Sequence, residues 1–483
     1  MAVEYDLVVI GGGSGGLVVA SLAAQLQAKV ALVEKEKLGG DCLWYGCVPS
    51  KSLIHAARVA YDVKHGSRFG IYTQPPEINF SEAIGHVQSV IAAIQPHDSP
   101  ERFRGLGVDV IFGSGEFSDR RTFTVDGRQL RARAFVVSTG SRPGIPPVEG
   151  LQEAGFLTNE KVFSLTERPD SLAVIGAGPI GCELGQAFHR LGAAVHIIAS
   201  RAQIMPKEDS EAAAVVEQQL LSEGIKIYKQ QRAKRVEVIE GKKHLWIGPS
   251  DGEPTEKLVV DDILVSSGRV PNVESLNLEA AGVKYDQQGI KVNGKLQTSN
   301  PRIYACGDVI GGYQFTHVAG FEGYYAAINS LMLPVFPLKS VDYSVIPWAT
   351  FTEPELARAG MSEKQARQRY DDVRVLKQPF AGVDRAQAEA ATEGFAKFIV
   401  RNDGTILGAH IVGPSAGELI HEVILAMRNK LKISALGSIH IYPTLSEVNS
   451  KASLLLTKQK FAESPWQKDL LAKFFQFRRS LFN

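Results

Sequence analysis

The chain of 483 residues lacks any run of about 18 apolar residues, the length that a membrane-spanning helix requires. It also lacks an excess of either charge, because 53 Lys and Arg face 52 Asp and Glu and leave a formal net charge of +1. This balance argues against a protein that binds nucleic acid through bulk charge and against an acidic tail. No basic segment precedes the first apolar run, so no signal peptide is predicted.

Cysteine is scarce as well. Four cysteines in the whole chain exclude a secreted protein built on disulfide bonds, and we expect a reducing, cytoplasmic location. Glycine, by contrast, is abundant: 46 residues make up about 9.5% of the chain, against a usual ~7%. With 44% apolar and 22% charged residues the chain can bury a large core, and its length suggests about three domains.

Several of these glycines lie in two copies of one local pattern. The pattern consists of a strand, a G-x-G-x-x-G turn, a helix and a second strand. The glycines are Gly11, Gly13 and Gly16 in the first copy and Gly176, Gly178 and Gly181 in the second. At this spacing the backbone can approach a pyrophosphate, and the N-terminus of the following helix faces it with free N–H groups. Because both turns have the flanking strands and helix that a bare glycine motif lacks, two dinucleotide sites are predicted.

The second strand of each copy ends differently. Glu34 follows Gly11 by 23 residues, and a carboxylate there can accept hydrogen bonds from the adenosine ribose hydroxyls. The same position in the second copy is Ala199, followed by Ser200 and Arg201. An acid at this point would repel a 2′-phosphate, whereas a guanidinium attracts one, so the second copy favours NADPH over NADH. The alternative for Arg201 is a solvated surface cation.

Two cysteines, Cys42 and Cys47, lie in the segment LGGDCLWYGCVPSK, between a glycine turn that includes Gly40 and a predicted helix. A structural disulfide is not expected in a reducing compartment. A structural zinc site needs four ligands, and Cys182 and Cys306 are isolated, so no structural metal site is predicted. Two unconnected core thiols remain an alternative. The pattern favours a redox dithiol at the start of a helix, where the positive end of the helix dipole stabilises a thiolate.

The segment GGDCLWYGCVPSK resembles the redox-active segment of the class I pyridine nucleotide–disulfide oxidoreductases, and the resemblance runs from Tyr5 to about Ala462. It implies an α/β fold with two Rossmann-like dinucleotide-binding domains, for FAD and NAD(P), and an α+β C-terminal dimerisation domain, hence a homodimer. The implied boundaries are 1–150 and 278–344 for the two parts of the FAD domain, 151–277 for the NAD(P) domain, 345–463 for the dimerisation domain and 464–483 for a tail.

The resemblance also implies roles for single residues. IYACGDV resembles the second flavin motif of the family and would put Asp308 on the ribityl chain. Lys51, one turn into the predicted helix, is expected to pair with Glu183 beside the nicotinamide and the flavin. Cys47 is expected next to the flavin ring, and Cys42 is expected to be the exposed thiol that meets substrate. The copies end in the motifs STGSRP and SSGRVPN, which add Thr139 and Gly140 for FAD and Gly268 for NADPH.

The segment HIYPTLSEVNS departs from the family pattern, in which a His-Pro pair supplies an imidazole to the partner subunit as general acid and base. Pro443 and Glu447 keep their places, but Tyr442 stands where the family has histidine. A phenol with a pKa of about 10 is a poor proton shuttle near neutral pH, whereas imidazole near 6.5 suits that role. His440 is either the alternative proton donor or a structural histidine in the interface.

This tyrosine makes the chain resemble the mercuric reductases. Thiolates bind soft metal ions, so Cys42 and Cys47 are candidate ligands for a substrate metal. Mercuric reductases also carry a vicinal cysteine pair on a C-terminal tail, whereas no cysteine follows Cys306 here. We expect hydride to pass from NADPH through FAD to a Cys42–Cys47 disulfide and on to a thiol-reactive oxidant, most like a metal ion. The alternatives are dihydrolipoamide dehydrogenase, another disulfide, quinone or hypothiocyanite reductase, and a nucleotide-binding protein without turnover.

The tail, SPWQKDLLAKFFQFRRSLFN, has apolar residues at helical spacing with lysines and arginines among them. Two interpretations remain open for it: an amphipathic helix packed on the dimer, and a basic helix that makes peripheral contact with a membrane surface.

Overall fold

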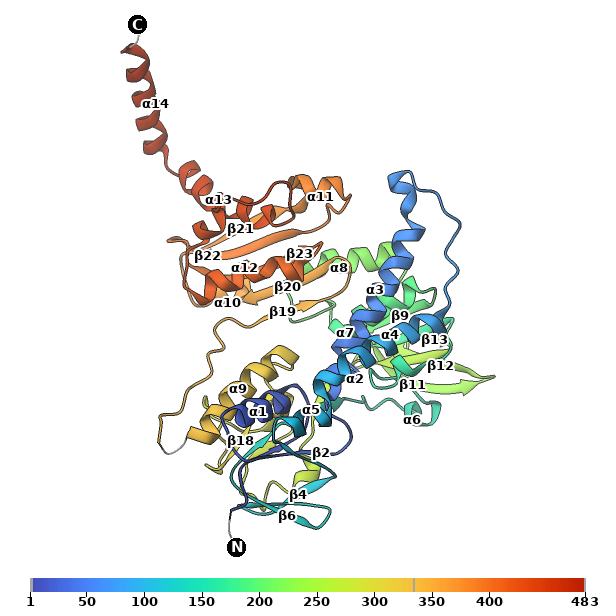
Figure 1. The fold of residues 1–483 in the computed structure, drawn as a ribbon. Helices are drawn as coiled ribbons and strands as arrows, with labels where there is room; N and C mark the ends of the chain where they lie inside the picture. Colours follow the sequence, from blue (N-terminus) through green and yellow to red (C-terminus); the bar gives the residue numbers. More distant parts are fainter. Residues whose placement is uncertain (1–2, 333–334, 482–483) are drawn as a thin grey trace. The chain divides into compact units, whose positions relative to one another are not determined.

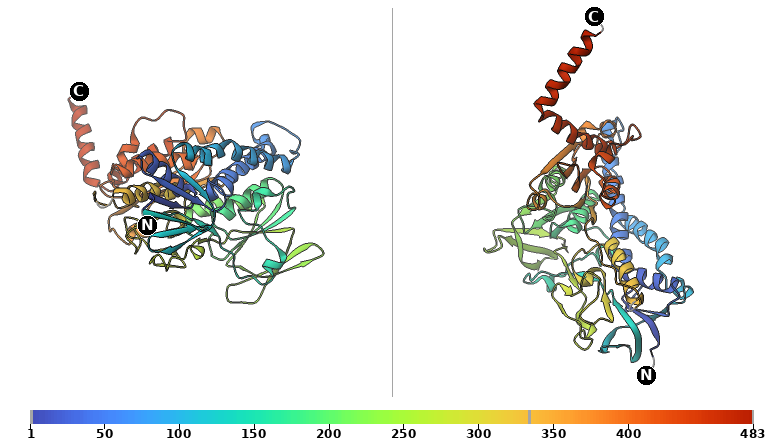
Figure 2. Two further views of the ribbon diagram at one scale, coloured as in Figure 1. Left: turned by 60° about the horizontal axis from the view of Figure 1, so that its bottom comes forward. Right: turned by 90° about the vertical axis from the view of Figure 1, so that its left-hand side faces the viewer.

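The computed structural model describes residues 3–332 and 335–481 of the chain. The chain divides into two compact units (Figures 1 and 2). The first unit comprises Met1–Ala202 and Ile225–Asp342, and the second comprises Gln203–Gly224 and Tyr343–Asn483. None of the described helices combines the length and the apolar character needed to cross a bilayer.

The first unit holds two parallel sheets built on one plan. The first sheet has the order β3-β2-β1-β6, with β1 (Tyr5–Ile10), β2 (Val30–Glu34), β3 (Asp109–Phe112) and β6 (Arg128–Val137). An antiparallel ribbon of β4 (Gly115–Asp119) and β5 (Thr122–Val125) extends from β6. Leu7, Val8 and Val9 are all fully buried, because a central parallel strand is covered on both faces and needs apolar side chains at successive positions.

The second sheet repeats this plan further along the chain. Its order is β10-β9-β8-β14, with β8 (Ser171–Ile175), β9 (Ala194–Ala199), β10 (Lys226–Lys229) and β14 (Asp262–Val265). An antiparallel sheet of β11 (Arg232–Ile239), β12 (Lys242–Gly248) and β13 (Glu256–Val260) follows β10. The chain then returns to the first sheet, where β18 (Ile303–Ala305) pairs in parallel with β6.

The ends of the two sheets are joined by a short ribbon. β7 (Ser141–Pro143) and β15 (Arg269–Pro271) pair in antiparallel fashion, with Arg269 opposite Pro143 and Pro271 opposite Ser141. These strands lie in the STGSRP and SSGRVPN motifs, so the two equivalent ends of the duplicated plan contact each other.

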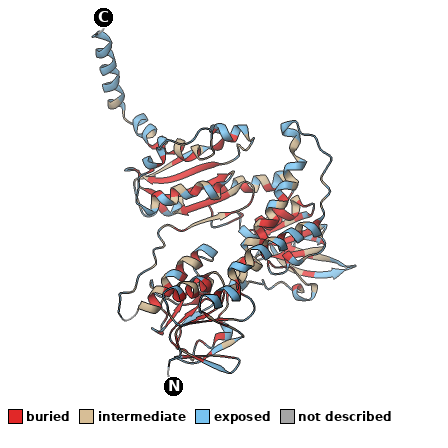
Figure 3. Cartoon of the chain, in the orientation of Figure 1, coloured by how far each residue is buried: buried red, intermediate tan, exposed pale blue. Residues whose placement is uncertain are grey.

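The second unit is built on an antiparallel sheet. Its order is β19-β20-β23-β22-β21, with β19 (Pro347–Thr350), β20 (Glu355–Gly360), β21 (Val373–Pro379), β22 (Phe395–Arg401) and β23 (Ile406–Gly413). Its longer helices are α8 (Ser210–Glu223), α12 (Ala416–Arg428), α13 (Glu447–Ala462) and α14 (Pro465–Ser480). Figure 3 shows the buried residues concentrated on this sheet, whereas α14 has no buried residue among those described.

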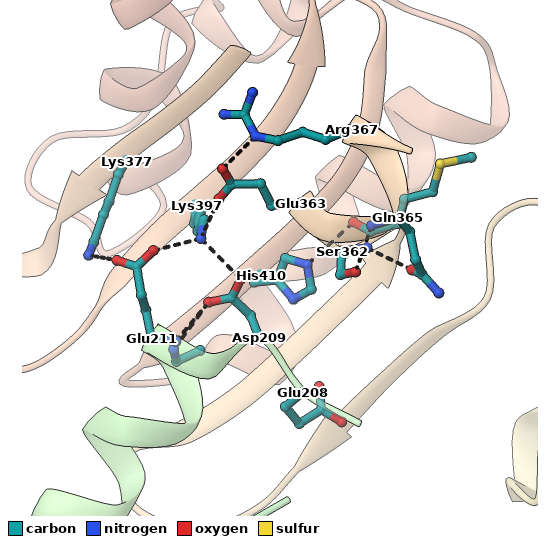
Figure 4. Close-up of polar contacts among 12 residues, drawn as sticks. Glu208, Asp209, Glu211, Ser362, Glu363, Gln365, Arg367, Lys377, Lys397 and His410 are labelled. Atoms are coloured by element: carbon teal, nitrogen blue, oxygen red, sulfur yellow. Dashed lines mark hydrogen bonds and ion pairs between the residues drawn. The ribbon is translucent and has the colours of Figure 1, made fainter. Parts of the chain in front are cut away.

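A buried ion cluster holds α8 within the second unit (Figure 4). Nζ of Lys397, whose side chain is 3% exposed, lies 3.0 Å from Asp209, 2.7 Å from Glu211 and 2.9 Å from Glu363. Burial opposes the charge of this ammonium, but hydrogen bonds to the three carboxylates outweigh burial and raise the pKa of Lys397. Nearby, burial lowers the pKa of His410 to about 4. Residues 203–224, which the sequence boundaries assign to the NAD(P) domain, therefore pack with the second unit.

Candidate active site

The first glycine turn connects β1 to α1 (Ser14–Gln25). Gly11 has φ +103°, and a Cβ on Gly16 would lie 1.9 Å from the Gly11 carbonyl oxygen, so both positions require glycine. Gly13 precedes the helix, and a Cβ on Gly40 would lie 2.7 Å from its Cα. Among the described residues no side chain caps α1, so its first N–H groups can bind an anion. This narrow cradle fits the pyrophosphate of a dinucleotide.

Glu34 lies at the end of β2 and faces the same turn. Its carboxylate accepts hydrogen bonds from the backbone N–H of Gly12 at 2.7 Å and of Glu36 at 2.8 Å. These two bonds hold the carboxylate where the sequence places the ribose partner of a bound dinucleotide.

The second glycine turn repeats this geometry between β8 and α7 (Pro179–Arg190). Gly176 has φ +119°, and a Cβ on Gly181 would lie 2.0 Å from the Gly176 carbonyl oxygen. A Cβ on Gly178, however, would meet no described atom within 4 Å, so this turn leaves open space in front of α7. No described side chain caps α7 either. The turn therefore fits a second dinucleotide.

The strand that follows this turn ends without a carboxylate. Ala199 is buried, while Ser200 and Arg201 are exposed. Within the described part of the chain, the Arg201 guanidinium has no hydrogen bond or ion pair, and only its backbone carbonyl is engaged, by the N–H of Gln230 at 3.2 Å. A free cation next to a buried alanine is suited to a phosphate group.

Asp308 belongs to a polar network that sequence reasoning missed. Its Oδ2 accepts a hydrogen bond from the Ser141 hydroxyl at 2.6 Å and lies 3.5 Å from Nε of Arg269. Arg269 also contacts Asp41 at 3.3 Å, which precedes the first thiol of the dithiol segment. Burial raises the pKa of Asp308. Ser141 lies in the STGSRP motif and Arg269 in the SSGRVPN motif. The equivalent places of these two motifs at the ends of the two copies were the sequence signal that could have predicted their contact.

Thr139 and Gly140 also lie at this junction, next to Asn272. The Thr139 hydroxyl donates to the Asn272 carbonyl at 2.8 Å, and the Asn272 amide donates to the Thr139 carbonyl at 2.9 Å. Gly140 and Gly268 have positive φ values of 68° and 136°, which side chains rarely adopt. These contacts fix the backbone of both strand ends, and the cofactor contacts of the three residues remain predictions.

The two thiols lie on consecutive helices, a short one and a long one. Cys42 is in α2 (Gly40–Trp44), and Cys47 is the first residue of α3 (Cys47–Lys64). Cys47 is exposed and Cys42 is half-buried. The expected places of Cys47 beside the flavin ring and of Cys42 toward the substrate stay predictions. Sγ of Cys47 lies 3.3 Å from the hydroxyl of Thr316, the first residue of α9 (Thr316–Met332). Sequence reasoning missed Thr316, because 269 residues separate it from Cys47.

The two thiols have opposite pKa shifts. A hydrogen bond from Cys42, with further help from Thr316 and the charge of Lys51, outweighs burial and lowers the pKa of Cys47 to about 6. The hydrogen bond to Cys47 and burial both raise the pKa of Cys42. At neutral pH the reduced pair therefore consists of a Cys47 thiolate and a Cys42 thiol, which is the arrangement of a poised redox dithiol.

Lys51 and Glu183 form an ion pair across the two nucleotide-binding halves of the first unit. Nζ of Lys51, on α3, lies 2.9 Å from Oε2 of Glu183, on α7, and the Glu183 side chain is 7% exposed. The pairing implied by the family resemblance is thus present, one helical turn from Cys47. The ion pair links the dithiol helix to the helix of the second glycine turn.

The residues of the HIYPTLSEVNS segment lie in the second unit. Tyr442 is exposed and donates a hydrogen bond to Asp384 at 2.9 Å, which raises the pKa of its phenol. Both ring nitrogens of His440 are engaged, one by the Ser438 carbonyl at 2.8 Å and the other by Glu422 at 3.3 Å. These contacts orient the ring, and the role of His440 as proton donor or structural residue stays a prediction. Glu447 begins α13.

Comparison with known proteins identifies relatives along most of the chain. A family model described as pyridine nucleotide-disulphide oxidoreductase matches residues 5–323, and a model of the dimerisation domain of that family matches residues 346–453. Mercuric reductase of Staphylococcus aureus is 33% identical over 458 residues, which cover 94% of this chain and 83% of the relative. Dihydrolipoyl dehydrogenase of Thermus scotoductus is 37% identical over 465 residues, which cover 94% and 98%.

A solved structure is also similar. The HOCl-induced flavoprotein disulfide reductase RclA from Escherichia coli aligns with a TM-score of 0.83 and 28% identity, covering 93% of this chain and 100% of that chain. Its Cu(II) complex aligns equally well, with a TM-score of 0.83 over 94% of this chain.

Proposed function

The chain belongs to the pyridine nucleotide-disulphide oxidoreductase family, and from this premise we propose that it reduces a thiol-reactive oxidant, most like a metal ion, with electrons from NADPH. The family uses FAD and a pyridine nucleotide, and the dimerisation domain indicates a homodimer. The observation that carries the proposal is the dithiol with opposite pKa shifts beside the Lys51–Glu183 pair.

In the first unit, one set of residues would bind FAD and another would bind NADPH. Gly11, Gly13 and the N-terminus of α1 would hold the pyrophosphate of FAD, and Glu34 would hold its ribose. Asp308, oriented by Ser141, would hold the ribityl chain. When bound, FAD supplies two-electron transfer between NADPH and the dithiol.

The second glycine turn would hold NADPH. The N-terminus of α7 supplies N–H groups for the pyrophosphate, and the open space at Gly178 admits it. The exposed Arg201 and Ser200, beside Ala199 in place of an acid, support binding of the 2′-phosphate.

The dithiol is the substrate end of the proposed mechanism. Cys47 carries the negative charge, Lys51 stabilises it, and Cys42 keeps its proton until an oxidant arrives. A soft cation bound by the two sulfurs displaces that proton to solvent. The two thiolates then give up two electrons and form the Cys42–Cys47 disulfide, and these electrons reduce one Hg(II) to Hg(0) or two Cu(II) to two Cu(I). NADPH would supply the two electrons that open the disulfide again. The relatives named mercuric reductase and the Cu(II) complex of the structural neighbour support a metal-ion substrate.

The exposed Tyr442 supports this preference over a disulfide substrate. Reduction of a disulfide needs a group that protonates the leaving thiolate, and the Asp384 hydrogen bond makes the Tyr442 phenol a still weaker acid near neutral pH. A metal ion has no leaving thiol to protonate.

A steady-state screen with NADPH against Hg(II), Cu(II), glutathione disulfide, lipoamide, a quinone and hypothiocyanite tests the proposal. We expect turnover with metal ions that Cys42→Ser abolishes, and little turnover with either disulfide. The second candidate, dihydrolipoyl dehydrogenase, has the support of the 37% identical relative. It predicts rapid lipoamide turnover with NAD that persists in Tyr442→Phe, and that result would replace the metal-ion proposal.

A further inference from the structure

The helix α14 (Pro465–Ser480) has an apolar face that no described residue of its own unit buries. Seven large apolar side chains, six in the helix and Leu481 directly after it, are between 42% (Leu471) and 67% (Trp466) exposed. Every residue of the helix except Gln467 is exposed. Figure 3 shows the exposed colour along the helix. The match to the family's dimerisation domain ends at residue 453, so α14, which begins at Pro465, lies outside the matched part of the chain.

These apolar side chains form one face rather than a scatter. At about 100° per residue, five of them fall within an arc of about 80°. They are Trp466, Leu470, Phe474, Phe477 and Leu481. Leu471 and Phe475 widen the face to about half of the circumference, and Gln467 and Arg478 interrupt the widened part. Four of the seven are aromatic, which gives the helix a large apolar surface for its length.

The charges of α14 are arranged around this face. The helix has four cationic side chains, Lys468, Lys473, Arg478 and Arg479, and one carboxylate, Asp469, which pairs with Lys473 at 2.8 Å. Lys468 and Lys473 lie at the two borders of the apolar face, where long side chains can reach past it to phosphate groups. The net charge of +3 on one short helix complements an anionic surface.

A second copy of this helix is a poorer match for the same face. A two-stranded coiled coil needs apolar residues at alternating spacings of three and four. Leu470, Phe474, Phe477 and Leu481 have this spacing, but they span only about 12 residues, less than the three to four heptads that a coiled coil sustains, and the seam position before them is Gln467. Trp466, Leu471 and Phe475 would lie outside this seam. The broad aromatic face suits an extended apolar phase better than this narrow seam.

We propose that α14 is a peripheral membrane helix that lies on an anionic lipid surface, with the face of Trp466, Leu470, Phe474, Phe477 and Leu481 in the acyl boundary and the cations among the headgroups. The proposal is independent of the proposed electron acceptor. The reductase would then be bound to a membrane surface, and α14 would make the contact with the lipid.

Co-sedimentation of the full-length holoenzyme with vesicles tests this proposal. The vesicles contain phosphatidylcholine alone or phosphatidylcholine with phosphatidylglycerol. We expect the anionic vesicles to bind at least about tenfold more protein at low salt, and added salt to release it. The triple variant Leu470→Ser, Phe474→Ser, Phe477→Ser should lose about tenfold or more of this binding.

The matched control is Ala472→Ser with Gln476→Ser on the polar side of the helix, which should bind like the unmodified protein. NADPH oxidation in solution should be unchanged in both variants, which shows that the folds are intact. Equal binding to both vesicle types, no binding to either, or full binding by the triple variant would overturn the proposal. A change of oligomeric state in the triple variant, without vesicle binding by the unmodified protein, would assign the face to a second copy instead.

Discussion

The two glycine turns of the first unit share one backbone geometry but differ in the residues that surround it. Each has a glycine at positive φ after a buried strand, and each has a second glycine whose Cβ would lie about 2 Å from the carbonyl of the first. The first copy adds Glu34 and the dithiol helix, whereas the second has Ala199 and the free Arg201. Under the proposed function, the shared part would serve dinucleotide binding, and the differences would determine which dinucleotide binds and where the electrons go.

The largest expected effect concerns the dithiol, which only the first copy has. Cys42→Ser and Cys47→Ser should each reduce oxidant-dependent NADPH oxidation to the background rate, because neither remaining thiol can form the disulfide. FAD content, measured by flavin absorbance after gel filtration, should stay at that of the unmodified protein. Substantial turnover in Cys42→Ser would show that electrons leave the protein by another route.

The second expected effect separates the two turns. Gly16→Ala and Gly181→Ala introduce the same close contact, at 1.9 and 2.0 Å from a carbonyl oxygen, and each should lower the free energy of unfolding by about 1–3 kcal/mol or more. Gly16→Ala should lose FAD on purification. Gly181→Ala should keep FAD but bind NADPH weakly, as measured by equilibrium titration.

Gly178→Ala is the matched control, because its Cβ meets no described atom within 4 Å. It should be as stable as the unmodified protein in thermal unfolding. Equal cofactor losses in Gly16→Ala and Gly181→Ala would contradict the assignment of one cofactor to each turn.

The third expected effect concerns the residues at the end of β9, which are changed to resemble those at the end of β2. Ala199→Glu with Arg201→Ala gives the second copy an acid like that of the first, which repels a 2′-phosphate and can bind ribose hydroxyls. The ratio of kcat/KM for NADPH over NADH should fall by about 100-fold, the equivalent of about 2.7 kcal/mol. Arg201→Lys should retain most of the preference. An unchanged ratio in the double variant would show that other residues select the nucleotide.

The smallest expected effect tests the hydrogen bond from α9 to the dithiol. The pKa of Cys47 is lowered to about 6, so its thiolate is present above that pH and is lost as the pH falls through it. Thr316→Val removes one stabilising hydroxyl, and the pKa should rise toward that of a free thiol. The pH dependence of Cys47 alkylation in the reduced protein measures this shift, and Thr316→Ser should keep the original midpoint.

The local parts of this architecture could be predicted from the sequence, because they depend on short-range constraints. The glycine turns follow from steric limits between residues five positions apart, such as Gly11 and Gly16. The Lys51–Glu183 pair followed from a family resemblance and is present at 2.9 Å. The preference for NADPH stays a prediction, since it depends on a ligand contact at Arg201.

Other parts required the tertiary structure. Thr316 reaches Cys47, and Ser141 and Arg269 reach Asp308, only through the packing of distant segments. The engagement of His440 by Glu422 likewise depends on the contact of its loop with α12. The roles of Cys47 toward the flavin and of Cys42 toward the substrate stay predictions, because both depend on contacts with bound molecules.

The central claim is that electrons from NADPH arrive at Cys42 and Cys47. The most direct test is mass spectrometry of the oxidised holoenzyme after alkylation under anaerobic conditions, before and after one equivalent of NADPH. We predict that neither cysteine is labelled before NADPH is added, that both are labelled afterwards, and that Cys182 and Cys306 remain unlabelled because they are buried. Labelling of both cysteines without NADPH, or of neither after it, would contradict the account.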